Sequence, residues 1–403
     1  MSWFLRMTLL VLPAVLAAYA YVGWRIAVTI GQLTSWPRPA IRWGTIAAAT
    51  YLNLYPLLLL VAGILQITAI TNTLRGGKRW ADLLFTFPFW GGLIIVVELL
   101  PLLLAIDLSR FALWPLFQKY RPLWMKWQAL ITVSLFAMIA IYVTARIIHD
   151  TYSVRLSKTD VRIPNLPAEL EGFRIVQLSD LQADPYTGER KMQKYIDLAN
   201  AQHPALILFA GDLVTRGTDH IAQGANMMGR LKARLGVYSC LGDHDYWAGA
   251  EAVARQLNRQ GVITIEDSVV TLSASQSKIS LTIVTNVYSR RPAVQTLENL
   301  RQQRPDDASV HLLLSHQPSP VLVEFAKENG YHLFLSGHTH GGQVVFKPLG
   351  MPVSVSHFET PFYSGFYQIG NLLLSVTNGL GLTVAPVRYQ APAEVTLLTL
   401  HRK

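Results

Sequence analysis

Residues 333–343 read Leu-Phe-Leu-Ser-Gly-His-Thr-His-Gly-Gly-Gln. A short apolar run is followed by two histidines, His338 and His340, with one residue between them. The apolar part predicts a buried strand, and the glycines and histidines after it predict a loop at the carboxyl end of that strand. Ligand sites of layered α/β folds gather at this end, because strand ends converge there and the loops are free to vary. Further copies of the pattern along the chain would therefore indicate one shared site.

The pattern recurs after four other apolar runs. Asp180 follows residues 175–179, Asp212 follows 206–211, Asp243, His244 and Asp245 follow 237–242, and His316 follows 312–315. Carboxylates and imidazoles without thiolates suit divalent ions such as Mn²⁺, Mg²⁺, Fe or Zn²⁺. An aspartate shared between two such ions would hold them roughly 3.5–4 Å apart, the spacing of two-metal hydrolysis.

Short β-rich runs alternate with helical patterns from residue 172 onward, which predicts an α/β or layered α+β domain. The predicted strands are 174–178, 205–210, 237–241, 280–285, 311–315, 332–336, 372–376 and 394–400. The predicted helices are 189–201, 220–235, 248–260, 293–303 and 321–329. The single cysteine, Cys240, excludes an internal disulfide and a zinc site built from thiolates.

The part before residue 150 has a different composition. Residues 1–150 contain 12 Lys+Arg against 4 Asp+Glu, so most of the net charge of +10 lies there and the remainder is close to neutral. The apolar windows 7–24, 43–74, 83–106 and 127–145 are each long enough to cross a bilayer. Tryptophans beside Arg or Lys at their ends are typical of the headgroup region, so the charge indicates a membrane rather than nucleic acid.

We therefore predict a multi-pass integral membrane protein with a transmembrane anchor over 1–150, a tether over 151–171 and a catalytic domain over 172–403. A cleaved signal peptide is the alternative for the first window. Four crossings place both ends of the anchor on one side, but its flanking basic residues divide evenly, so neither side is favoured. Glu98, inside the third window, is either a functional group or a carboxyl that is protonated or hydrogen-bonded to a neighbouring helix.

Five motifs in register resemble the calcineurin-like metallophosphoesterase family over about residues 172–400. They are Asp180-Leu181, Gly211-Asp212, Gly242-Asp243-His244-Asp245, His316 and Gly337-His338-Thr339-His340. The block 338–343, the turn 379–381, Arg388 and the run Pro392-Ala393-Glu394 look like the membrane-anchored bacterial branch of that family. The resemblance implies a four-layer αββα sandwich. The expected fold is thus an α-helical transmembrane bundle of about four spans followed by this sandwich, in a bacterial inner membrane.

The resemblance also implies roles for individual residues. Asp180 and His340 would bind a first metal, Asp212 would lie between two metals, and Asp243, His316 and His338 would bind the second. His244 would lie beside the phosphoryl group and protonate the leaving oxygen, and we expect Asp245 to orient it. Arg388 is either a contact to a substrate phosphate or part of a surface ion pair.

Two positions depart from the family pattern. Gln182 stands where the family usually has a histidine ligand, and Asp243 where it usually has asparagine. Gln182 is therefore either a weak ligand or a hydrogen-bond partner of one. Both changes move the site toward oxygen ligation, which favours Mn²⁺ or Mg²⁺ over Fe or Zn²⁺ and leaves a mononuclear centre open.

The expected activity is hydrolysis of a phosphodiester or pyrophosphate bond by a metal-activated water, without a covalent enzyme intermediate. Anchoring favours a lipid-linked substrate, such as a nucleotide-glycolipid precursor or a phospholipid headgroup. The expected partners are membrane lipids and a phosphorylated small-molecule or lipid-linked substrate, with no nucleic acid. The alternatives are an anchored general phosphodiesterase or phosphomonoesterase and a non-catalytic metal-binding sensor.

Overall fold

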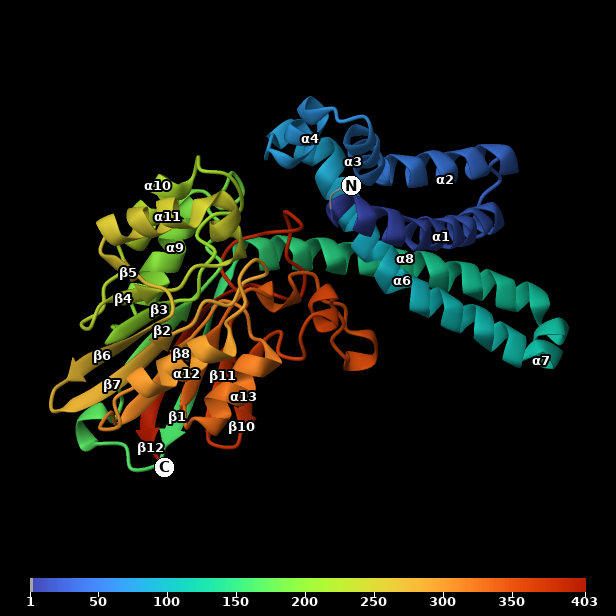
Figure 1. Cartoon of the computed structure of the whole chain (residues 1–403). Helices are drawn as coiled ribbons and strands as arrows, with labels where there is room; N and C mark the ends of the chain where they lie inside the picture. Colours follow the sequence, from blue (N-terminus) through green and yellow to red (C-terminus); the bar gives the residue numbers. More distant parts are fainter. Residues whose placement is uncertain (1–2) are drawn as a thin grey trace. The chain divides into compact units, whose positions relative to one another are not determined.

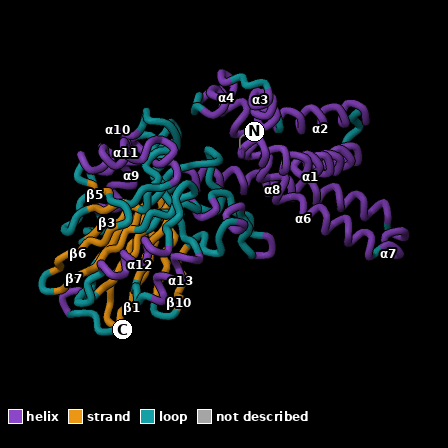
Figure 2. The backbone as a smooth tube through the Cα atoms, viewed as in Figure 1, coloured by secondary structure: helices purple, strands orange, loops and turns teal. Residues whose placement is uncertain are grey.

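The computed structural model describes residues 3–403. It divides into two compact units, Met1–Ile148 and His149–Lys403. Figure 2 shows helices throughout the first unit, whereas the second combines strands with helices that flank them.

The first unit is built of apolar helices (Figure 1). They are α1 (Trp3–Leu33), α2 (Arg38–Leu52), α3 (Leu54–Ile64), α4 (Thr68–Arg75), α5 (Arg79–Ala81), the π-helical turn η1 (Asp82–Thr86), α6 (Phe87–Ala112), α7 (Trp114–Lys119) and α8 (Arg121–Tyr152). In the described part of the chain, three stretches are long and apolar enough to cross a membrane: Leu9–Leu33, Arg79–Ala112 and Arg121–Tyr152. Helices α2 and α3 together make a fourth if the pair is one broken span.

The second predicted span, residues 43–74, is not one continuous helix. Helices α2 and α3 meet at an angle of 54° around Asn53. The Asn53 side chain donates to the carbonyl of Ala49 at 2.8 Å. Pro56, in the first turn of α3, has no backbone N–H to donate to the preceding turn. These two features explain why the apolar run breaks there.

A polar cluster joins three helices of this unit. The Asp107 carboxylate on α6 accepts from Tyr21 Oη of α1 at 2.7 Å and from Gln128 Nε2 of α8 at 3.3 Å. Arg25 Nε lies 3.3 Å from the same carboxylate, and its side chain is buried. Sequence analysis singled out Glu98 on α6 but not this carboxylate. The cluster gives α1, α6 and α8 a specific polar contact among apolar side chains.

The second unit contains two six-stranded mixed sheets. Their strand orders are β1-β12-β2-β3-β4-β5 and β10-β11-β9-β8-β7-β6. The strands are β1 (Val154–Ile163), β2 (Arg174–Leu178), β3 (Leu206–Phe209), β4 (Val237–Ser239), β5 (Val262–Thr264), β6 (Ser268–Ala274), β7 (Ser277–Ile283), β8 (Val310–Leu314), β9 (Leu333–Ser336), β10 (Gly365–Ile369), β11 (Leu372–Val376) and β12 (Ala393–Arg402). The helices are α9 (Glu189–Asn200), α10 (Ile221–Met228), α11 (Asp243–Arg259), α12 (Val294–Gln303) and α13 (Pro320–Glu328), with 3₁₀ turns η2 (Ala168–Leu170), η3 (His340–Gly342), η4 (Pro348–Gly350) and η5 (Val355–Phe358).

Three hydrophobic cores stack these elements into four layers. One core lies between the sheets and contains Ile175 and Leu208 of the first sheet with Leu312 of the second. A second core packs α9, α10 and α11 on the outer face of the first sheet. A third packs α12 and α13 on the outer face of the second sheet. The predicted αββα sandwich is confirmed, and all eight predicted strands are present.

The predicted tether over 151–171 is wrong for most of its length. Residues 154–163 form β1, which pairs in parallel with β12 from Val154↔Ala393 to Ile163↔Arg402. Lys158, Asp160 and Arg162 occupy the exposed face of this edge strand, whereas Ser157 and Thr159 are half-buried on the face that carries the buried Val161 and Ile163. An ion pair with a 2.6 Å contact between Arg155 Nε and Glu394 Oε2 joins the two strands.

Other differences are smaller. Strands β5, β6 and β10 were not predicted, and α10 ends at Met228 rather than near residue 235. The parallel strands β2, β3 and β4 in one sheet, and β7, β8 and β9 in the other, point their carboxyl ends in a common direction within each sheet. This arrangement positions the candidate site.

Candidate metal centre

The predicted ligands converge at the carboxyl ends of five strands. Asp180 follows β2, Asp212 follows β3, Asp243 follows β4, His316 follows β8, and His338 and His340 follow β9. Two groups of ligand atoms each lie within 4.8 Å of one another: Asp243 with His316 and His338, and Asp180 with Asp212 and His316. These groups contain five of the six residues, and the sixth, His340, has its Nε2 3.3 Å from Asp180 Oδ1, so residues spread over 160 positions of sequence lie at one place.

Four of these residues adopt a backbone conformation that side-chain-bearing residues rarely have. The φ angles of Asp180, Asp212, His338 and His340 are 51°, 62°, 72° and 51°. Residues held in this left-handed region cost conformational energy and cluster at functional sites. A Cβ at Gly242 would lie 2.2 Å from Asp212 Oδ1, so only glycine allows the β4 loop to approach that carboxylate.

The group around Asp243 is closely packed. Its Oδ2 lies 3.0 Å from His338 Nδ1 and 3.3 Å from His316 Nε2. His316 Nδ1 contacts the carbonyl oxygen of Ala210 at 2.7 Å, which fixes that nitrogen as the donor and leaves Nε2 to face the carboxylates. This is the tautomer that a metal-binding imidazole needs.

The group around Asp180 leaves polar atoms without partners. Its Oδ1 is buried with no hydrogen-bond partner, and His340 Nε2 lies 3.3 Å away. His316 Nε2 lies 3.5 Å from Asp212 Oδ2, which links this group to the first. A buried carboxylate oxygen without a partner is costly, and a divalent cation would satisfy it. The donor set, oxygen and imidazole nitrogen, therefore fits such an ion.

Burial and mutual charge perturb the ionisation of the site. Burial would lower the pKa of His338, but hydrogen bonds to Asp243 and Glu359 raise it to about 9. Burial also tends to raise the pKa of Asp243, yet His316 and His338 lower it well below its usual range. Burial raises the pKa of Asp212. The aspartates thus lie in a region where a positive charge is strongly favoured.

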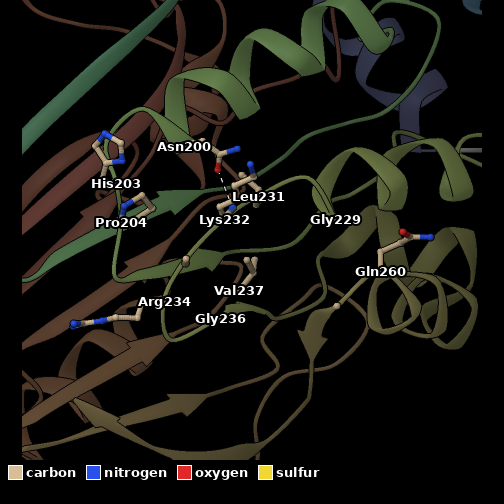
Figure 3. Close-up of a pocket in the computed structure, with 12 residues that line it drawn as sticks. Asn200, His203, Pro204, Gly229, Leu231, Lys232, Arg234, Gly236, Val237 and Gln260 are labelled. Carbon is tan, nitrogen blue, oxygen red and sulfur yellow. Dashed lines mark hydrogen bonds between the residues drawn. The ribbon is translucent and has the colours of Figure 1, made fainter. Parts of the chain in front are cut away.

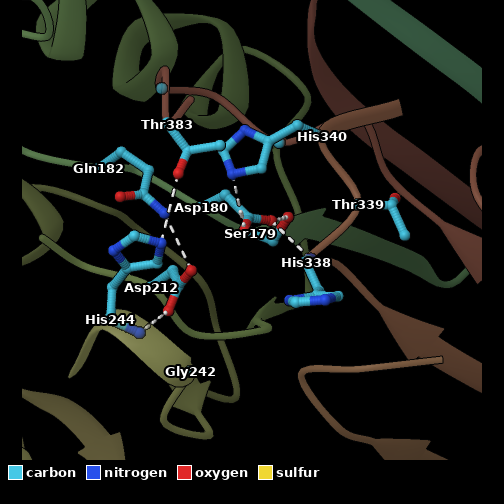
Figure 4. Close-up of polar contacts among 12 residues, drawn as sticks. Ser179, Asp180, Gln182, Asp212, Gly242, His244, His338, Thr339, His340 and Thr383 are labelled. Carbon is cyan, nitrogen blue, oxygen red and sulfur yellow. Dashed lines mark hydrogen bonds and ion pairs between the residues drawn. The ribbon is translucent and has the colours of Figure 1, made fainter. Parts of the chain in front are cut away.

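Gln182 is a hydrogen-bond donor in this structure. Its Nε2 donates to Asp212 Oδ2 at 2.9 Å, while its Oε1 is buried without a partner (Figure 4). Of the two roles considered for this residue, the geometry supports the partner of a ligand: the amide holds the Asp212 carboxylate in place.

His244 lies beside the centre, where a general acid would be needed. Its Nδ1 lies 2.5 Å from the carbonyl oxygen of Thr215, and its Nε2 lies 3.3 Å from Thr383 Oγ1. The ring also packs edge-on against Trp247, with centroids 4.7 Å apart. The Thr215 carbonyl, not a carboxylate, thus orients this imidazole.

The role expected of Asp245 is therefore wrong. Its carboxylate accepts from the backbone N–H groups of Gly242 at 2.9 Å, Asp212 at 2.8 Å and Leu213 at 2.8 Å. Asp245 is the third residue of α11, so its side chain turns back to cap the helix. Through the same bonds it fixes the loop that carries Asp212.

Arg388 fits neither of its two expected roles. Its side chain is only 1% exposed, which excludes a surface ion pair. Its guanidinium donates to carbonyl oxygens of three segments: Ala391 at 2.8 Å, His340 at 3.3 Å, and Asn378, Gly379 and Gly381 at 2.9, 3.2 and 2.7 Å. Burial lowers the pKa of Arg388 to about 10, so it is still cationic at neutral pH. Through these hydrogen bonds Arg388 holds the segment of His340 and the 378–381 turn in place.

Sequence analysis missed several residues that contact the expected ligands. Glu359 Oε1 lies 2.8 Å from His338 Nε2, and Gln317 Nε2 donates to Asp243 Oδ2 at 2.6 Å. The backbone N–H of Tyr288 donates to Asp243 Oδ1 at 2.6 Å. The position of Gln317 directly after the predicted ligand His316 could have indicated that its side chain lies near the site. Glu359 and Tyr288 lie in irregular segments without a pattern that marks them.

A separate groove lies at the amino ends of the strands of the first sheet. It has a volume of about 840 Å³ and is lined by residues such as Pro204, Gly236 and Gly261, which precede β3, β4 and β5 (Figure 3). These are the amino ends of the strands, opposite the ligands. The groove is therefore separate from the candidate metal centre.

Comparisons with known proteins agree with this geometry. The family model for calcineurin-like phosphoesterases matches residues 173–342, which include every expected ligand. The uncharacterized metallophosphoesterase YkuE of Bacillus subtilis is 30% identical over 258 residues, covering 62% of this chain and 87% of that protein. The chain belongs to the calcineurin-like phosphoesterase family.

A second relative is named as a membrane protein. A transmembrane protein with metallophosphoesterase domain from Danio rerio is 25% identical over 287 residues, covering 68% of this chain. The chain spans 62% of the length of that relative. Among solved structures, the NAD nucleotidase of Haemophilus influenzae covers 52% of this chain and 50% of its own at a TM-score of 0.35 and 15% identity.

Proposed function

We propose that the protein is a membrane-anchored, metal-dependent hydrolase that cleaves a phosphodiester or pyrophosphate bond. The observation that carries the proposal is the pair of ligand groups that meet at His316, with an unpartnered oxygen of Asp180 facing the centre. Divalent ions held there, Mn²⁺ or Mg²⁺ in our proposal, would supply Lewis-acid charge stabilisation and acidify a water. Asp180, Asp212, Asp243, His316, His338 and His340 are the proposed ligands.

His244 is the proposed general acid. Because Nδ1 faces the Thr215 carbonyl, Nε2 is the nitrogen that can pass a proton to the leaving oxygen. Thr383 Oγ1 lies 3.3 Å from Nε2, within hydrogen-bond distance of the nitrogen that would carry this proton. Gln182 and Asp245 hold the Asp212 carboxylate and its loop, and Glu359 orients His338. These residues position the ligands and take no part in proton transfer.

The proposed substrate is lipid-linked, and the proposed partners are membrane lipids rather than nucleic acid. Three or four apolar spans precede the domain, which raises the effective concentration of any substrate carried by the same membrane. We propose the cell (inner) membrane of a bacterium as the location; the apolar helices of the first unit support the membrane, and relatives such as the one from Bacillus subtilis support a bacterial cell. An anchored hydrolase of soluble phosphoesters is the alternative.

The test uses purified full-length protein in detergent with a chromogenic phosphodiester. We expect turnover with Mn²⁺, loss of turnover with a chelator, and a decrease in kcat of about 10²–10⁴-fold in His244→Asn, the usual contribution of general acid–base catalysis. Bound metal should be unchanged in this variant. The matched control is His203→Asn, at an exposed residue of the loop before β3, which should keep full activity.

Two outcomes would contradict the proposal. Metal bound tightly without turnover of any phosphoester would indicate a sensor. Full activity of His244→Asn would remove the general acid from the mechanism. A lipid preference would appear as a higher kcat/KM for a phosphodiester embedded in vesicles than for its soluble analogue.

A further inference from the structure

The segment between β9 and β10 carries exposed apolar side chains next to the metal loop. Phe358 is 90% exposed, Val355 79% and Met351 63%. Residues 346–358, called here the apolar loop, contain no acidic residue and one lysine, Lys347. The loop lies outside both sheets, in the orange-red part of the ribbon in Figure 1. Contiguous exposed apolar side chains of this kind mark interaction surfaces.

The apolar loop is held in a defined conformation. Phe346 and Val353 exchange two backbone hydrogen bonds of 2.9 and 2.7 Å, which close the loop at its base. Ser356 Oγ donates to the carbonyl of Thr339 at 3.1 Å, between His338 and His340. The exposed side chains are therefore presented by a structure that is fastened to the metal loop.

The base of the apolar loop is also linked to the end of α8. Val345 N donates to the carbonyl of Tyr389 at 3.0 Å, which places the loop beside residues 388–390. Those residues bond in turn to the last turn of α8: Gln390 N to Asp150 Oδ2 at 2.6 Å, and Arg388 N to Thr151 Oγ1 at 2.9 Å. The links lie within the second unit.

Only a few residues of α8 separate its apolar part from the residues that bond to 388–390. The uncharged part of the helix ends at residue 145, and Asp150 follows five residues later, or about 7 Å along a helix axis that rises 1.5 Å per residue. The headgroup layer adds roughly 5–8 Å on each side of the hydrocarbon core. The length of chain between the apolar part of α8 and Asp150 is therefore no greater than the thickness of one headgroup layer.

We propose that the apolar loop rests on the lipid surface, with Phe358, Val355 and Met351 in the interface. Two further exposed apolar residues flank the proposed general acid: Trp247, 61% exposed and packed on His244, and Val384, 67% exposed and next to Thr383. Exposed apolar side chains therefore lie next to the proposed general acid as well as in the apolar loop. A lipid bilayer is the occupant that fits, because the segment is apolar, lacks acidic groups and is linked through residues 388–390 to the end of a helix that is long and apolar enough to span a membrane.

The test is a fluorescence experiment on the full chain, which does not require turnover. Phe358→Cys, in a Cys240→Ala background, is labelled with an environment-sensitive fluorophore and reconstituted into phosphatidylcholine–phosphatidylglycerol vesicles with doxyl-labelled lipids. We expect a shift of emission to shorter wavelength and loss of fluorescence to the doxyl group. The matched control is Gln276→Cys, in the exposed β6–β7 turn at the opposite edge of the second sheet, which should show neither change.

A functional variant gives a second readout. Val355→Asp combined with Phe358→Asp should keep kcat on a soluble phosphodiester, because neither side chain contacts an expected ligand, and should lose activity on the vesicle-embedded ester. Equal doxyl quenching at residues 358 and 276, or none at 358, would overturn the proposal. A spectral shift without doxyl quenching would also overturn it, since a second copy of the chain would then cover the loop. Because quenching is independent of catalysis, failure of the hydrolase proposal would leave this result interpretable.

Discussion

Asp212→Asn is expected to abolish metal-dependent turnover while leaving the fold intact. Asparagine has nearly the same shape, tolerates the left-handed backbone that Asp212 adopts at φ 62°, and can still accept the bond from His244 N at 2.8 Å. It removes the negative charge that lies between the two ligand groups. Since a bound metal contributes several kcal/mol of transition-state stabilisation, and each 1.36 kcal/mol is tenfold in rate, we expect kcat to fall by about 10³-fold or more.

The measurement combines kcat with the metal content of the purified protein. A binuclear centre should lose more than one equivalent of metal on this substitution, whereas a mononuclear centre on the Asp243 side should keep its ion and lose mainly rate. Asp306→Asn, at an exposed carboxylate in the loop after α12, is the matched control. Unchanged metal content together with unchanged kcat would show that Asp212 is not a ligand.

Arg388→Met is expected to be among the most destabilising single substitutions in the domain. Methionine fills part of the volume but leaves five backbone carbonyl oxygens without their donor in a site that is 1% exposed. Removal of a buried, fully bonded charge usually costs about 3–5 kcal/mol. A change of this size corresponds to a fall in Tm of about 10 °C for a unit of this length. Metal affinity should fall as well, because His340 and the 378–381 turn lose their support.

Arg174→Met is the control for this change. Arg174 is exposed and donates one bond, to the carbonyl of Gln202 at 2.8 Å, so its loss should lower the free energy of unfolding by less than about 1 kcal/mol. Both variants can be compared by thermal unfolding in detergent. A normal Tm with a raised KM in Arg388→Met would instead restore the substrate contact that the sequence suggested.

The candidate site could be predicted because its ligands follow regular elements. The expected ligands come after apolar runs, and parallel strands of one sheet end together, so Asp180, Asp212 and Asp243 could be grouped without coordinates, as could His316 and His338. Most strands of the two sheets could likewise be predicted, because they are short apolar runs. Hydrophobic pattern and strand direction are properties that the sequence shows locally.

The errors concern residues whose role depends on distant partners. Arg388 and Asp245 are polar groups in loops or helix starts, and only the fold reveals that they bond to backbone groups rather than to substrate or to His244. The charges of residues 155–162 resemble a solvated linker until β12, far along the chain, supplies a partner strand. Pairing with a strand far along the chain leaves no periodic pattern in residues 155–162 themselves.

The pairing of β1 with β12 also bears on how the protein is made. Arg155 and its partner Glu394 are 239 positions apart, and β1 lies at the edge of its sheet beside β12. During translation β1 stays without its partner strand until residues 393–402 have been made. Such non-local pairing slows folding and exposes strand edges to aggregation and proteolysis. A nascent chain that stops before residue 393 would leave both β1 and β2 without the strand that joins them, so its first sheet would stay incomplete and its strand edges exposed.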